Sequence, residues 1–220
     1  MERPRPAGGS QASCLHFCLM KGQLPQRPAG WHSRGYLPHF DAELPQFITF
    51  RLHDSLPRSV LIGWQEELRR ETQADVQAIL RRRVEAYLDQ GHGSCYLRDH
   101  QVAEMVQNSL LFHDLTKYRL AAWCVMPNHA HLLCTPCIGH SLAEIAHSLK
   151  SYTAKEANKI LGRSGRFWQK EYFDRYIRNA RHYAKVVEYI ENNPVKARLC
   201  KKPSDWPFSS ARFRKTSDDD

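Results

Sequence analysis

The segment LAAWCVMPNHAHLLCTP, residues 120–136, constrains the fold of this chain more than any other stretch. It holds two short apolar runs on either side of Pro127 and Asn128. Proline fixes its own φ and asparagine tolerates turn geometry, so the pair predicts a sharp strand–turn–strand unit. His129 and His131 open the second run, and alternation along a strand places both on one face. Two imidazoles on one face, just after a turn, favour metal or phosphate chemistry over simple packing.

Length and composition bound the class of protein. A chain of 220 residues suits one main domain with a sizeable core. It has no run of eighteen apolar residues, which argues against a membrane span, and its first apolar run is short and poorly suited to a signal peptide. The seven cysteines are odd in number and scattered, which is typical of reduced thiols. We therefore expect a cytoplasmic protein.

Positive charge is concentrated in the C-terminal part of the chain. The formal net charge is +9, and residues 147–215 hold 17 basic against 6 acidic side chains, so this segment carries the whole excess. Aromatic residues are interleaved with the bases, a pattern that predicts a nucleic-acid surface. A solvated helical face over an aromatic core is the alternative. The residues expected to contact nucleic acid are Lys150, Arg166, Trp168, Lys170, Arg175, Arg178 and Lys196.

The pattern along the chain predicts its organisation. We expect a flexible N-terminal arm over residues 1–30, one domain over residues 31–215, and a disordered acidic tail over residues 216–220. Periodicity predicts a strand over residues 45–52, then a helical pattern over residues 59–90, read as one long helix or as two. The predicted helix caps are Ser59, Asp99, Ser141 with Glu144 in a capping box, and Asn179, whose helix ends near Pro194. Intermixed helices and strands predict an α+β fold with a mainly antiparallel sheet.

On the last predicted helix, Tyr189 lies beside the apolar stripe rather than on it. A step of 100° per residue centres the stripe close to Ile190 and places Asn193 one turn beyond Tyr189 on the same flank. A tyrosine on a flank, with an amide one turn away, is not placed like an ordinary core residue. By contrast, Tyr152 lies on the stripe of its own helix, so core packing is predicted there.

Four segments in order, WCVMPNHAHLL, FWQKEYFDRYIRN, EYIENNPVKARL and SDWPFSSAR, resemble the single-tyrosine HUH transposases, and within them the REP-associated tyrosine transposases. The resemblance covers about residues 34–212. It implies a ferredoxin-like fold with helices on one side of the sheet. It also implies an enzyme that cuts and rejoins single-stranded DNA near hairpins during DNA transposition and recombination. The expected partners are REP-like palindromic hairpins, the expected location is the nucleoid, and the expected state is a monomer or homodimer.

The same resemblance assigns roles to residues. His129 and His131 match the catalytic metal-binding pair, Asn193 matches the third metal ligand, and Tyr189 matches the nucleophile. The implied cofactor is Mg²⁺ or Mn²⁺. A phenol attacking a phosphodiester would leave a 5′-phosphotyrosine and a free 3′-hydroxyl, and the covalent link would allow rejoining without a nucleotide cofactor. Two features depart from the family pattern: the small Ala130 between the histidines and the charged helical segment 59–90.

Three other readings are weighed against this one. A zinc site could use both histidines with Cys134 and Cys137, although alternation turns Cys134 away from the histidines. A protein of the same fold could bind hairpin DNA without cutting it. A structural RNA-binding module is the third alternative.

Overall fold

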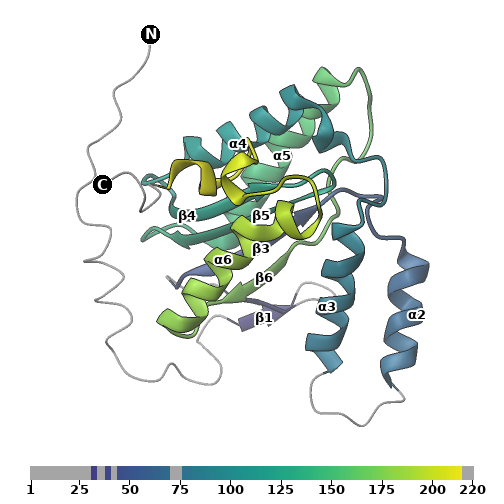
Figure 1. The fold of residues 1–220 in the computed structure, drawn as a ribbon. Coiled ribbons are helices and arrows are strands. Elements are labelled where there is room, and N and C mark those ends of the chain that lie inside the picture. The colour runs from purple at the N-terminus through teal and green to yellow at the C-terminus, as the bar shows by residue number, and fades with distance from the viewer. Residues whose placement is uncertain (1–30, 34–37, 41–43, 70–75, 215–220) are drawn as a thin grey trace.

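The computed structural model describes residues 31–33, 38–40, 44–69 and 76–214 (Figure 1). The predicted arm, residues 1–30, and the predicted tail, residues 216–220, lie outside the described residues. The strands and α-helices are β1 (Trp31–Ser33), β2 (Pro38–Phe40), β3 (Gln46–Arg51), α2 (Arg58–Arg69), α3 (Val76–Asp89), α4 (His100–Phe112), β4 (Tyr118–Val125), β5 (His129–Pro136), α5 (Leu142–Ile160), β6 (Phe173–Tyr176) and α6 (Ala180–Lys196).

Four of these strands form the central sheet, in the order β4-β5-β3-β6, and all neighbouring pairs are antiparallel. Helices separate β3 from β4 and β5 from β6, while β4 and β5 are joined by the predicted turn. This is the strand order of a ferredoxin-like α+β fold, so the predicted fold class is confirmed. The β3–β5 register sets Arg51 opposite His129 and Thr49 opposite His131.

The two faces of the sheet carry two separate clusters of buried side chains. Ile48, Leu132 and Cys134 pack with buried residues of α4 and α5 on one face. Phe47 and Leu133 pack with residues of α6 on the other. The expectation of helices on one side therefore holds for α4 and α5, whereas α6 covers the opposite face (Figure 1). The central strands are buried on both sides, which is why their apolar runs are nearly continuous.

The helix boundaries follow local sequence signals in most cases. The cap residues Asp99 and Asn179 accept backbone hydrogen bonds as predicted, and Ser141 forms the predicted capping box. The segment 59–90 forms two helices, α2 and α3, and α2 already begins at Arg58, so Ser59 is not its cap. The last helix runs through Pro194 to Lys196, because a proline in the final turn removes only one backbone donor.

Tyr152 is a correction to the prediction. It is 56% exposed. The buried stripe of α5 passes from Leu149 to Thr153 and Ala157, one position beyond the predicted path. The tyrosine ring is thereby turned toward solvent.

The C-terminal segment closes the outer edge of the sheet at β4. The Val125 amide donates to the Phe208 carbonyl over 2.9 Å, and the Trp206 indole donates to the Val125 carbonyl over 2.9 Å. A β-bridge joins Cys124 to Ser209. The motif SDWPFSSAR therefore caps an edge strand that would otherwise expose unpaired backbone groups. Within the described chain, no helix has the length and apolar character needed to cross a membrane.

Candidate active site

Two buried histidines open β5, and each has one ring nitrogen held in place. His129 and His131 are each 1% exposed, and their ring centroids are 4.6 Å apart. The Nδ1 atom of His129 lies 2.7 Å from Oδ1 of Asn128, and that of His131 lies 2.9 Å from the hydroxyl of Thr49. Both Nε2 atoms are buried and have no hydrogen-bond partner among the described residues. The predicted pairing of the two imidazoles on one face of a strand is confirmed.

Tyr189 of α6 packs directly on this pair. Its ring centroid is 5.5 Å from that of His131 and 5.8 Å from that of Phe47, both in edge-on contacts. Asn193 lies one turn further along α6 and is completely buried. The buried stripe of α6 runs through Val186 and Ile190, so the tyrosine occupies the predicted flank.

The polar atoms of this cluster are buried without partners. Besides the two imidazole Nε2 atoms, the hydroxyl of Tyr189 and both amide atoms of Asn193 make no hydrogen bond of good geometry within the described part of the chain, although Glu85 and Asn193 lie close to the hydroxyl. Native proteins pair nearly all buried polar atoms, because an unpaired one costs about 1–3 kcal/mol. Here five such atoms lie on four side chains, those of His129, His131, Tyr189 and Asn193. A cluster of this kind is typical of a site that receives a ligand.

Burial sets the protonation states of the cluster. It lowers the pKa of His129 to about 3, with the charge of Lys196 adding to the effect. Burial, then His129 and Lys196, also hold the pKa of His131 well below its usual value. Both rings are therefore neutral at physiological pH and have a lone pair to offer. Burial, then the carboxylates of Glu85 and Asp89, raise the pKa of Tyr189.

Helix α3 supplies groups that the sequence did not point to. The Asp89 carboxylate forms a 2.7 Å ion pair with the Lys196 amine, which lies 5.6 Å from the centre of the Tyr189 ring. Glu85, one turn before Asp89, lies beside the tyrosine hydroxyl. Burial raises the pKa of Glu85, against the lowering effect of Lys196, Arg81 and other bases. The helical segment that departs from the family pattern thus reaches the site itself.

The predicted DNA-contacting residues fall into two groups. Trp168 is a correction: it is 4% exposed, its indole donates to Thr153, and it belongs to the core, so it offers no stacking surface. Lys150 is half-buried, donates to the Gln169 and Lys170 carbonyls, and burial lowers its pKa to about 8. The remaining predicted bases are exposed or half-buried: Arg166, Lys170, Arg175, Arg178 and Lys196.

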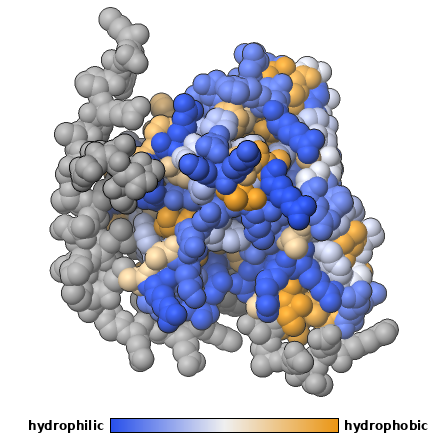
Figure 2. Space-filling view, viewed as in Figure 1, coloured by the Kyte–Doolittle hydropathy of each residue, from blue (hydrophilic) through white to orange (hydrophobic). Residues whose placement is uncertain are grey.

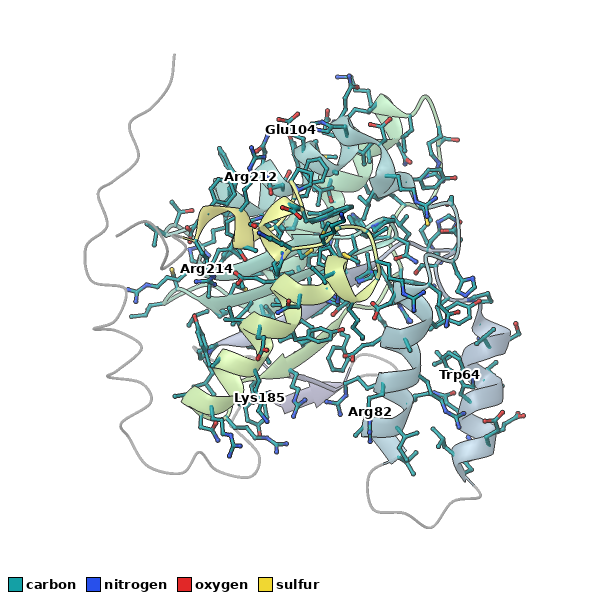
Figure 3. All side chains as sticks on the ribbon, in the orientation of Figure 1. Trp64, Arg82, Glu104, Lys185, Arg212 and Arg214 are labelled. Atoms are coloured by element: carbon teal, nitrogen blue, oxygen red, sulfur yellow. The ribbon has the colours of Figure 1, made fainter. Side chains whose placement is uncertain are left out.

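The face that carries α6 and α3 is mostly hydrophilic, with only small hydrophobic areas (Figure 2). Lys185 of α6 and Arg82 of α3 lie at the lower edge of this face in the view of Figure 3. Bases from the two helices therefore share one side of the molecule.

The alternative zinc site does not assemble in this structure. Cys134 is fully buried in the cluster beneath α4 and α5, on the face opposite the histidines. Across the described residues, no group of three or more His, Cys, Asp or Glu side chains could hold a metal ion. A metal at this site would depend on the two imidazoles and the amide of Asn193.

Comparisons with known proteins find similarity over part of this chain. Residues 99–193 match the family model described as "Transposase IS200 like". The REP-associated tyrosine transposase of Escherichia coli K12 is 31% identical over 112 residues, 47% of this chain and 64% of that protein. A "Putative REP-associated tyrosine transposase" of Haemophilus influenzae is 29% identical over 103 residues, 42% of this chain and 58% of that protein. The matched segment thus spans less than two thirds of these curated relatives.

Among solved structures, a REP-associated tyrosine transposase bound to a REP hairpin aligns with 83% of this chain and 82% of its own, at 21% identity and a TM-score of 0.49. At that level of similarity, the fold assignment stands on the strand order described above. The matched family segment contains the histidine pair, Tyr189 and Asn193. Residues 99–193 accordingly resemble an IS200-like transposase domain, and part of the chain is similar in sequence to REP-associated tyrosine transposases.

Proposed function

We propose that this protein is a metal-dependent transposase that cuts and rejoins single-stranded DNA beside hairpins, through a phosphotyrosine at Tyr189. The observation that carries the proposal is the cluster of buried, unpartnered polar atoms on His129, His131, Tyr189 and Asn193. A packing role would leave these atoms unpaired at a cost, whereas a cation and a phosphate would pair them. The match of residues 99–193 to the IS200-like transposase model supports the same interpretation.

The donor set fits a divalent cation such as Mg²⁺ or Mn²⁺. His129 and His131 would offer Nε2, and Asn193 would offer its amide oxygen. Nitrogen ligands suit Mn²⁺ at least as well as Mg²⁺. Because the protein would supply only these three ligands, other coordination positions on the ion would remain open for phosphate and water. When bound, the ion would polarise a non-bridging phosphate oxygen and offset the charge that develops on it.

In the proposed reaction, Tyr189 Oη forms a bond to the scissile phosphorus, and the bond from phosphorus to the 3′-oxygen breaks. The departing 3′-oxygen takes up one proton from solvent, so the products are a 5′-phosphotyrosine and a 3′-hydroxyl. The proton lost by the phenol goes to Glu85, the carboxylate beside that hydroxyl. Burial raises the pKa of Glu85 and so makes it a better proton acceptor than an ordinary glutamate. Attack by another 3′-hydroxyl on the phosphotyrosine reverses these changes and rejoins DNA.

The first test uses Tyr189→Phe with Tyr152→Phe as its matched control. Tyr189→Phe keeps the ring that packs on Phe47 and His131 but removes the only atom proposed to attack phosphorus. End-labelled single-stranded hairpin DNA is incubated with each variant and Mn²⁺, and a denaturing gel is examined for label that migrates with protein. We expect the adduct with wild type and Tyr152→Phe, and none with Tyr189→Phe.

An adduct formed by Tyr189→Phe would refute the proposed nucleophile. Binding of the hairpin by wild type without any adduct would instead support the non-cutting alternative. A matched RNA hairpin, bound more tightly than DNA, would support the RNA-binding alternative.

A further inference from the structure

Asn128, which the sequence marks only as a turn residue, is completely buried between α3 and the histidine pair. Its side-chain amide donates to two backbone carbonyls, that of Leu88 over 3.1 Å and that of His92 over 2.9 Å. Its oxygen Oδ1 lies 2.7 Å from Nδ1 of His129. One side chain thus connects the end of α3 to a predicted metal ligand.

These contacts leave one hydrogen-bonding arrangement. A carbonyl oxygen can only accept, so the two carbonyls of Leu88 and His92 must face the NH₂ group of Asn128. The atom facing His129 is then the amide oxygen, which is also only an acceptor. His129 must therefore donate from Nδ1, and its Nε2 carries the lone pair. The tautomer that can bind a cation through Nε2 is set before any ligand arrives.

The partner of His131 does not have this property. The hydroxyl of Thr49, 2.9 Å from Nδ1 of His131, can rotate to donate or to accept. Thr49 can therefore accompany either tautomer of His131. Of the two histidines, only His129 has its tautomer determined by its partner, because the Asn128 amide is itself oriented by two backbone carbonyls.

The loop after α3 has a backbone conformation that several contacts hold in place. Gly93 has a φ of +86°, and a Cβ there would lie 2.9 Å from the backbone oxygen of Asp54. The ring of His92 stacks on Tyr87 with centroids 4.0 Å apart. The Asp54 carboxylate accepts a 2.9 Å hydrogen bond from the Ser94 amide. These contacts fix the backbone from which the His92 carbonyl reaches Asn128.

From this network we infer that Asn128 is a positioning residue, anchored on the end of α3, that holds His129 as the Nδ1–H tautomer and so prepares Nε2 to bind the cation. The inference rests on the proposed function only in treating His129 as a metal ligand. Hydrogen-bond partners of metal-bound histidines commonly have this effect, and their loss lowers metal affinity about 10- to 100-fold. Helix α3 would then be part of the site rather than an appendage.

The experiment compares Asn128→Ala with Asn128→Asp. Both variants lose the two bonds to the Leu88 and His92 carbonyls, so both should lose thermal stability. Only the aspartate keeps an oxygen to accept from His129. Long-range ¹H–¹⁵N spectra of metal-free, ¹⁵N-labelled protein report the tautomer of each imidazole, and a His129→Gln spectrum assigns the signals. Mn²⁺ affinity is measured on the same samples by titration calorimetry.

Wild type and Asn128→Asp should show His129 as Nδ1–H, whereas Asn128→Ala should lose that signature and bind Mn²⁺ about 10- to 100-fold more weakly. Thr153→Val, which removes a buried hydrogen bond to Trp168, is the stability control and should leave both readouts unchanged. Two results would overturn the inference: Nε2–H at His129 in wild type, or equal Mn²⁺ affinities for folded Asn128→Ala and Asn128→Asp. The wild-type spectrum decides even if a variant does not fold. Neither readout involves DNA cleavage, so failure here is distinguishable from failure of the proposed function.

Discussion

Two neutral imidazoles in the core make the stability of this protein depend on pH. Burial lowers the pKa of His129 to about 3 and holds that of His131 well below its usual value, whereas both titrate near pH 6.5 in an unfolded chain. Below about pH 6.5 the unfolded state therefore binds protons that the folded state does not. The free energy of unfolding should fall as pH decreases, by up to about 1.4 kcal/mol per pH unit for each histidine.

Urea unfolding at a series of pH values between 7.5 and 5, in excess chelator, measures this effect. The variant with both His129→Gln and His131→Gln lacks the two groups but keeps all others, so the difference between wild type and variant isolates them. As the pH decreases, the free energy of unfolding of wild type should fall more steeply than that of the variant. Parallel curves for the two proteins would contradict the prediction.

At the scale of single residues, the sequence predicts what depends on local spacing. The histidine pair and the Tyr189–Asn193 flank follow from the periods of a strand and a helix, and both are found in the structure. Trp168 and Tyr152 are predicted wrongly because burial depends on which distant element covers a side chain. Asn128 and Asp89 are missed as parts of the site because their partners lie far away in sequence: Asn128 bonds Leu88, 40 residues away, and Asp89 bonds Lys196, 107 residues away.

At the scale of elements, the C-terminal segment fixes the position of α6. The hydroxyl of Ser210 donates to the Glu191 carboxylate over 2.7 Å, and the Arg214 guanidinium reaches the same oxygen over 2.6 Å. Ser210 also accepts from the backbone amide of Trp123 on β4 over 3.2 Å. Glu191 lies between Tyr189 and Asn193 along α6, so this clamp holds the helix that presents both residues. Sequence alone shows the motif but not its partner.

Ser210→Ala should therefore destabilise the fold by about 1–3 kcal/mol, because it leaves a buried amide and a largely buried carboxylate with one partner fewer. Urea unfolding at pH 7.5 measures the change. Thr116→Ala, which removes an exposed hydroxyl bonded to the His113 carbonyl, is the control and should cost less than about 0.5 kcal/mol. Equal losses for the two variants would show that the clamp contributes nothing beyond an ordinary surface hydrogen bond.

At the scale of the whole molecule, bases from three elements converge on the tyrosine. Arg81 of α3, Arg175 of β6 and Lys196 of α6 all exert their charge on Glu85, which lies beside the Tyr189 hydroxyl. Arg81 and Arg175 act also on His182, and the ring of Phe173 lies 5.4 Å from the Arg81 guanidinium. A single strand that brings a phosphate to Tyr189 would pass this cluster. The basic surface is therefore only partly C-terminal. Helix α3 contributes to it, although the helical segment 59–90 as a whole has no excess of basic over acidic residues.

Arg81→Ala tests whether α3 lines the DNA path. Binding to single-stranded DNA releases counterions, so the logarithm of affinity should fall linearly with the logarithm of salt concentration, by about 0.7 for each phosphate contact. Removal of one contact should weaken binding at low salt and reduce the slope by about 0.7. Lys155→Ala removes an equal charge from an exposed position on α5, across the sheet, and should leave the slope unchanged. Dissociation constants for all three proteins across a salt series give the slopes.

A flat line for wild type would exclude phosphate contacts as the source of affinity. Identical slopes for wild type and Arg81→Ala would place the DNA away from α3, leaving the bases of β6 and α6 to bind it.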